Sequence, residues 1–173
     1  RRRMTEPSPH SSLVRLEGVT RILPGIVPAT LVRDIDIEIG HGEFIAITGP
    51  SGSGKSSLLY LLGLLDRPTE GRVWFDGHDT ATLGDDALAR LRLERLGFVF
   101  QFHFLLEEFS VLDNVMIPMR RLGRLDGPAR RTFAHGILDD LDIADQADKR
   151  PNQLSGGQRQ RVAVARALAN DPP

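Results

Sequence analysis

The feature that most constrains this chain is a glycine-rich octapeptide, Gly-Pro-Ser-Gly-Ser-Gly-Lys-Ser, at residues 49–56. It matches the phosphate-loop pattern in full and lies between an apolar run and a helix-forming segment, which is the context that the pattern requires. Glycines let successive backbone N–H groups converge on phosphate oxygens, and a helix N-terminus adds partial positive charge. We predict ATP binding by nine residues: Gly49, Pro50, Ser51, Gly52, Ser53, Gly54, Lys55, Ser56 and Ser57.

The segments around this loop carry strand and helix patterns. Residues 44–48 are continuously apolar, which is typical of a parallel strand buried on both faces. Residues 55–62 are apolar nearly all round and predict a core helix. Period-two alternation predicts a strand at 34–39, and residues 13–19 and 73–75 also favour strands, the latter running into an Asp-Gly turn.

Helical patterns dominate the second half of the chain. Leucines and arginines divide between two faces over residues 88–95, and residues 97–101 return to strand character. Ser110 and the pair Gly127-Pro128 are typical helix starts. We therefore predict an α/β fold with a mixed β-sheet core and a helical subdomain.

Composition excludes several classes of protein. The 40% hydrophobic content of the 173 residues suffices for one core, and the longest apolar run, 58–65, is too short to span a membrane. A formal net charge of -1 gives no reason to expect nucleic acid as a partner. With no cysteine, neither a disulfide framework nor a thiolate metal site is expected, and the cytoplasm is the default compartment.

A second motif, Leu-Ser-Gly-Gly-Gln, occupies residues 154–158 ahead of a helical segment. Its serine is a typical helix N-cap, and its two glycines leave the backbone bare, so the helix start offers another anion site. An ordinary capped helix is the alternative when this motif is taken alone. The motif comprises Leu154, Ser155, Gly156, Gly157 and Gln158.

With these two motifs, residues 13–173 resemble the ABC ATPase family, whose signature is this second motif. The resemblance implies a P-loop fold that binds ATP and Mg²⁺, with Gln101 as the Q-loop glutamine and with Ser56 and Gln101 as metal ligands. It also implies a head-to-tail pair of ATP-binding domains, in which the signature of one completes the ATP site of the other.

Residues 61–71 and 100–106 look like the branch of the family that serves lipoprotein release and macrolide export. The resemblance therefore implies membrane permease subunits as partners, a cytoplasmic location on the inner face of the cell membrane, and ATP hydrolysis that drives export or extraction. We expect part of the apolar run over residues 102–109 to form a groove for a helix of the permease.

Two departures from the family pattern stand out. The place of the aromatic residue that stacks on adenine is held by Leu23. The Walker B Asp and Glu, the D-loop and the switch His follow a segment like residues 170–173, so we expect them beyond residue 173. Glu107 and Glu108 have the pattern of a solvated face. No catalytic acid or base is identifiable, and we expect the chain as printed to bind nucleotide without hydrolysing it efficiently.

The expected organisation is a flexible N-terminal tail at 1–12, an ATP-binding core at 13–101, and a helical subdomain with the signature at 102–173. Two alternatives stay open, a non-transport ABC ATPase and a non-catalytic truncated fragment. Repair and chromosome-structure members carry a long coiled coil between the Q-loop and the signature, and the short stretch between Gln101 and Ser155 disfavours them.

Overall fold

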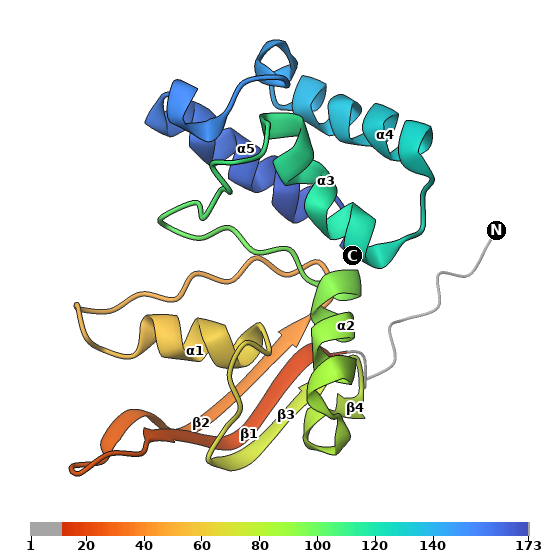
Figure 1. Ribbon diagram of the computed structural model, residues 1–173. Helices are drawn as coiled ribbons and strands as arrows, with labels where there is room; N and C mark the ends of the chain where they lie inside the picture. The colour runs from red at the N-terminus through yellow and green to blue at the C-terminus, as the bar shows by residue number, and fades with distance from the viewer. Residues whose placement is uncertain (1–11, 173) are drawn as a thin grey trace, which may run out of the picture. The chain divides into compact units, whose positions relative to one another are not determined.

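The computed structural model describes residues 12–172 and divides the chain into two units, with the division between Leu88 and Ala89 (Figure 1). Each unit is described by itself. The expected tail at 1–12 lies outside the described residues except for Ser12, with which the first strand begins. The expected boundary at residue 101 stays a prediction.

The first unit is built on an antiparallel sheet. Among the described residues this sheet has four strands, in the order β2-β1-β3-β4: β1 Ser12–Leu23, β2 Ala29–Gly40, β3 Glu70–Phe75 and β4 His78–Asp79. Along β2, the isoleucines at 35, 37 and 39 are partly buried and the acidic residues between them are exposed, as the alternation predicts. The turn between β3 and β4 is formed by Asp76 and Gly77, as predicted.

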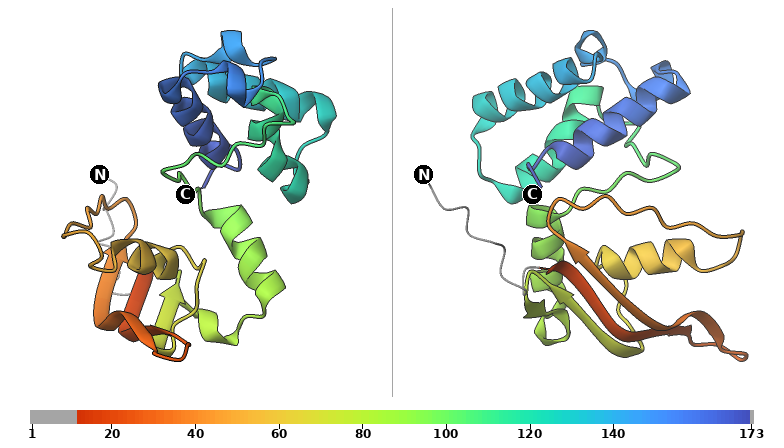
Figure 2. Two further views of the ribbon diagram at one scale, coloured as in Figure 1. Left: turned by 60° about the vertical axis from the view of Figure 1, so that its left-hand side comes forward. Right: turned by 180° about the vertical axis from the view of Figure 1, so that it is seen from behind.

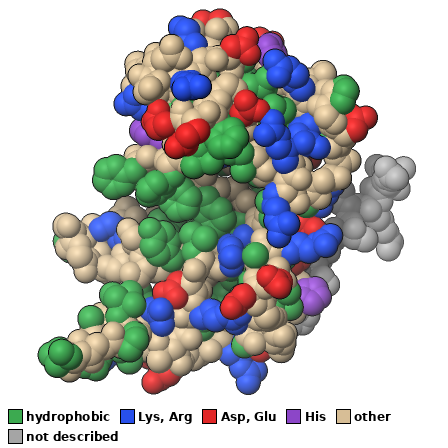
Figure 3. Space-filling model, viewed as in Figure 1, with side chains coloured by type: hydrophobic (Ala, Val, Ile, Leu, Met, Phe, Trp, Pro, Cys, Tyr) green, Lys and Arg blue, Asp and Glu red, His purple; other side chains and the backbone are tan. Residues whose placement is uncertain are grey.

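The turn between β1 and β2 carries exposed apolar side chains. Ile26 and Val27 lie at this turn and are almost completely exposed. Figure 3 shows apolar side chains gathered at the tip of this hairpin. Single exposed apolar residues are common on protein surfaces, so the exposure of these two does not by itself indicate a function.

Helix α1, Lys55–Leu62, lies along one face of the sheet (Figures 1 and 2). Leu61 and Leu62 are buried, whereas Leu59 and Tyr60 are 54% and 45% exposed. The prediction of a helix is confirmed, but the expected burial on all sides is wrong. The apolar composition of α1 exceeds what one packed side can cover in the first unit.

The expected buried strand at 44–48 is also wrong for the described part of the chain. This segment is extended but unpaired, and Phe44 and Ile45 are 94% and 50% exposed. The expected strand at 97–101 is likewise not formed. A strand is stabilised by hydrogen bonds to a neighbour, and neither segment has a pairing partner among residues 12–172. A strand-like sequence pattern indicates a segment that is stabilised by burial, but it does not supply the neighbouring strand that the segment needs for hydrogen bonding.

Helices form the second unit. Helix α2, Asp85–Arg95, contains the division between the units and confirms the helix predicted there. Three helices pack together after it: α3 Val111–Leu122, α4 Gly127–Asp140 and α5 Gly156–Leu168 (Figure 1). Short 3₁₀ turns occur at Thr80–Thr82 in the first unit and at Ala144–Gln146 and Pro151–Gln153 in the second. Fully buried Val115, Leu138 and Val162 bring α3, α4 and α5 into one core.

Local caps explain where these helices begin. The Ser110 hydroxyl accepts a hydrogen bond from the Asp113 backbone N–H at 3.0 Å and caps α3. Asp126 caps α4, and Gly127 and Pro128 follow as its first residues. Both predicted helix starts are confirmed, because capping depends on side chains within one turn of the helix end.

Candidate functional site: a phosphate loop and a capped signature helix

The phosphate loop holds its shape through glycines. Gly52 and Gly54 have φ values of 79° and 87°, in the left-handed region that glycine adopts without strain. A Cβ added to Gly54 would lie 2.4 Å from the Leu31 carbonyl oxygen of β2, whereas one added to Gly52 would meet nothing within 4 Å. Gly54 is therefore required twice, for its backbone angle and for the close approach of the loop to β2.

Lys55 lies folded into this loop. Its Nζ donates hydrogen bonds to the carbonyl oxygens of Gly49 and Pro50 at 2.8 and 2.6 Å, and Ser53 Oγ lies 3.5 Å away. These contacts hold the ammonium group within the curve of the loop. A positive charge fixed at this place favours an anion beside it.

The first turn of α1 has backbone N–H groups without hydrogen-bond acceptors among the described residues. Its N-cap is Gly54, which has no side chain to accept from the first N–H groups, and the turn contains no acidic residue. Among residues 12–172, no hydrogen bond leaves the backbone N–H groups of Lys55, Ser56 or Ser57. Unpaired N–H groups, the helix dipole and the Lys55 ammonium together form an anion site of the phosphate-binding type.

A cleft of about 500 Å³ adjoins the loop on the side of β2. Its lining combines backbone of the loop with side chains of β2: Thr30, Leu31, Val32, Arg33, Ile35, Ile47, Thr48, Gly49, Pro50, Ser53, Gly54, Lys55 and Leu58. This volume is within the range of small-molecule sites. Leu23, expected near adenine, ends β1 and is 42% exposed, and it does not line the cleft.

The signature begins α5 with two reciprocal hydrogen bonds. Ser155 Oγ accepts from the Gln158 backbone N–H at 3.3 Å, and Gln158 Oε1 accepts from the Ser155 N–H at 2.9 Å. Leu154 is buried and anchors the turn, whereas Gly156 and Gly157 are exposed. A Cβ on either glycine would meet nothing within 4 Å, so no contact within the described residues requires glycine there.

Gln101 is exposed in a turn of the second unit. The rings of Phe98 and Phe100 stack at 5.8 Å, and Phe104 packs edge-on against Phe100 at 5.4 Å. Arg166 of α5 donates hydrogen bonds to the backbone carbonyls of His103 and Phe104 at 2.5 and 2.6 Å. Sequence reasoning missed this role of Arg166, although a charged residue between alanines of a buried helix face is a usable signal.

The two expected metal ligands are found in different units. Ser56 is exposed in the first turn of α1 in the first unit, and Gln101 is exposed in the second unit, so their pairing as metal ligands stays a prediction. Across residues 12–172, no three His, Cys, Asp or Glu side chains gather as a metal site would require. Mg²⁺ takes oxygen ligands from protein groups, waters and substrate phosphates, and the serine hydroxyl of a phosphate loop, here that of Ser56 beside the anion site, is a donor of this kind.

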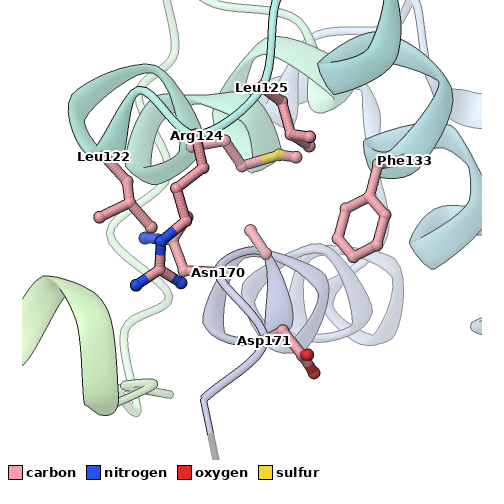
Figure 4. A pocket seen from close by; sticks show the side chains of 8 residues that line it. Leu122, Arg124, Leu125, Phe133, Asn170 and Asp171 are labelled. Atoms are coloured by element: carbon pink, nitrogen blue, oxygen red, sulfur yellow. The ribbon is translucent and has the colours of Figure 1, made fainter.

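Another pocket, of about 220 Å³, lies wholly within the second unit. Figure 4 shows Leu122, Leu125 and Phe133 around it, with Arg124 and Asp171 at its rim. None of the predicted site residues lines this pocket. Glu107 and Glu108 are exposed, as expected for a solvated face.

A glycine-rich loop leading into an uncapped helix, together with a second, serine-capped helix start, is the arrangement expected of a P-loop fold of the ATP-binding cassette type. The chain belongs to the ABC transporter family, whose model matches residues 32–173. A solved dimeric ATP-binding cassette, described in a post-hydrolysis state with ADP and Pi bound, superposes with a TM-score of 0.87 at 43% identity and covers 92% of this chain and 71% of its own. The expected fold class is confirmed.

Three relatives of known name indicate which branch of the family this chain resembles. The lipoprotein-releasing system ATP-binding protein LolD 1 of Chlorobium chlorochromatii is 45% identical over 94% of this chain and 67% of its own length. LolD of Anaeromyxobacter dehalogenans is 50% identical over 92% and 67%. The macrolide export ATP-binding/permease protein MacB 1/2 of Paracoccus denitrificans is 49% identical over 92% of this chain and 24% of its own length. The resemblance to the branch of lipoprotein-releasing and macrolide-export proteins is confirmed.

Proposed function

We propose that this chain is the ATP-binding part of an exporter or extractor of the lipoprotein-releasing or macrolide-export type. The observation that carries the proposal is the anion site at the start of α1, where the Lys55 ammonium and the unpaired N–H groups of one helix turn converge. ATP phosphates bind there through residues 49–57, and the Ser56 hydroxyl holds Mg²⁺. Gln101 supplies the second protein ligand of the metal in this proposal.

Calorimetry with Mg-ATP tests the binding site. Lys55→Ala removes the charge-assisted contact to phosphate and is expected to weaken binding by about 2 kcal/mol, which is about 30-fold in Kd. The matched control is Lys149→Ala, which removes the same charge from an exposed position of the second unit and leaves affinity unchanged. Equal affinity of Lys55→Ala and the unmodified protein would refute the site.

The signature glycines support a head-to-tail dimer. Gly156 and Gly157 are exposed, no neighbour among residues 12–172 requires glycine at either position, and the Ser155 hydroxyl lies beside them. A second copy brings its bound γ-phosphate to this helix start. Gly156→Trp is expected to abolish an ATP-dependent dimer in size-exclusion chromatography and to keep ATP binding. An unchanged dimer would count against this arrangement.

The membrane partner is supported by an apolar surface and by the relatives. Phe102, Phe104, Leu106 and Phe109 are between 38% and 75% exposed in the second unit, which is where a permease helix docks in this proposal. Among residues 12–172, no helix combines the length and the apolar composition of a membrane span. We place the chain on the inner face of the membrane, held by its permease.

Phe102→Asp tests the docking surface: loss of co-purification with the permease at unchanged ATP affinity supports it, and retained co-purification contradicts it.

Inefficient hydrolysis by the chain as printed stays a prediction. A phosphate-release assay on the calorimetry samples measures the rate of ATP hydrolysis. Lys55-dependent turnover at roughly 1 s⁻¹, the scale of ordinary enzymes, would contradict the prediction.

A further inference from the structure

Arg166, in the last turn of α5, contacts the segment that carries Gln101. Its guanidinium donates from Nη1 to the Phe104 carbonyl at 2.6 Å and from Nη2 to the His103 carbonyl at 2.5 Å. The side chain is about half-buried, and burial lowers the pKa of Arg166. The group stays charged at neutral pH, because an arginine pKa lies far above 7. One planar cation therefore holds two consecutive carbonyls.

Those two carbonyls belong to residues in an unusual conformation. His103 and Phe104 have φ values of 57° and 47°, in the left-handed region that side chains with a Cβ avoid. Such conformations persist where the surrounding structure imposes them. The backbone bonds that close the turn are short-range, from His103 N to the Phe100 carbonyl and from Phe104 N to the Phe102 carbonyl. Arg166 supplies a long-range contact that holds this turn.

The chain on the other side of Gln101 is fixed to the same end of α5. A Cβ added to Gly97 would lie 2.4 Å from the Ala167 carbonyl oxygen, so the backbone passes against α5 as closely as glycine allows. Asn170 Nδ2 donates to the Leu93 carbonyl at 2.9 Å. Contacts from α5 and the residue two beyond its end therefore flank the Gln101 segment on both sides.

Helix α5 connects these contacts to the signature. It begins at the Ser155 cap and ends at Leu168, and its buried residues Val162, Ala163 and Ala165 fix it in the second unit. A single α-helix transmits a displacement of one end to the other, since its backbone hydrogen bonds make it stiff.

We propose that Arg166 is a positioning residue that fixes the Gln101 turn to the signature helix, so that the turn and the signature move as one piece. The functional part rests on the proposed role of Gln101 at the ATP site. Lysine cannot replace arginine fully, because one ammonium lacks the planar fork that reaches two adjacent carbonyls. The turn loosens without Arg166, and the anion site of the first unit is unaffected.

Limited proteolysis of the full-length subunit tests the contact. Chymotrypsin cleaves after phenylalanine, and Phe102 and Phe104 are 75% and 61% exposed. Arg166→Met is expected to raise cleavage in this turn about tenfold or more, since cleavage follows the population of opened segments. Arg161→Met is the matched control, because Arg161 of the same helix donates to the Leu141 and Asp142 carbonyls, away from the turn.

Unchanged cleavage in Arg166→Met with a native circular dichroism spectrum would overturn the proposal. If Arg166→Met does not fold, Arg166→Lys decides, because it keeps the charge and one of the two hydrogen bonds. We expect chymotrypsin to cleave the turn of Arg166→Lys faster than that of the unmodified protein and of Arg161→Met. A rate equal to that of the unmodified protein in Arg166→Lys overturns the proposal as well.

Steady-state kinetics of the full-length subunit with its permease separate positioning from a purely structural role. Arg166→Met is expected to lower kcat about tenfold with KM within about twofold, since ATP binds in the other unit and the loss falls on a group that acts during turnover. An unchanged kcat overturns the functional part. Failure of the unmodified protein to bind ATP would refute the proposed function and leave the proteolysis result standing.

Discussion

Replacing Gly54 by alanine perturbs the phosphate loop at its tightest point. Alanine at a φ of 87° pays the left-handed penalty of about 1–2 kcal/mol. The added Cβ would also lie 2.4 Å from the Leu31 carbonyl oxygen and 3.2 Å from Val32 Cγ1, and relieving such overpacking costs about 1–3 kcal/mol. We expect the free energy of unfolding of the first unit to fall by about 2–5 kcal/mol.

Gly52→Ala is the matched control for this prediction. Its φ of 79° carries a similar penalty, but its Cβ would enter open space, so we expect a loss of only about 1–2 kcal/mol. Urea unfolding followed by Trp74 fluorescence measures both, because Trp74 is the single tryptophan and lies in β3, with its indole N–H donating to Glu17 at 2.8 Å. Equal losses in the two variants would refute the close approach of the loop to β2.

Two further predictions concern the start of α3. Asn114 is fully buried and bonds the backbone N–H and carbonyl of Leu106 at 2.8 and 3.0 Å, so Asn114→Leu is expected to cost about 1–3 kcal/mol in urea unfolding, and a loss below that range would contradict its anchoring role. Burial raises the pKa of Asp113, but hydrogen bonds from Ser110 and Arg120 outweigh it and bring the pKa below 3.8. Because the pKa of Asp113 is lower in the folded state, its carboxylate stabilises the protein above pH 3.8, and this stabilisation is lost as the pH falls through the folded pKa. Asp113→Asn should therefore remove this part of the loss of stability in acid. Identical pH profiles of the free energy of unfolding for the two proteins would contradict this prediction.

The sequence by itself determined the features that depend on neighbours within a few residues. The glycine pattern at 49–56 specifies a loop whose backbone angles glycine alone adopts easily, and Ser155 with Gln158 specifies a helix start. The alternation along β2 predicts one partly buried face, which the sheet provides. These signals are readable because capping and strand alternation act within one helix turn or one strand.

Only the tertiary structure decided the fate of the segments that need distant partners. Residues 44–48 carry the composition of a buried strand, yet a strand requires a hydrogen-bonded neighbour that sequence spacing does not supply, and Phe44 is 94% exposed. Arg166 gives the opposite case: the alanines beside it mark it as a charged residue on a packed helix face, but only the folded structure shows that its guanidinium binds the carbonyls of His103 and Phe104. Both depend on which parts of the chain meet after folding, and packing between residues far apart in the sequence makes that choice.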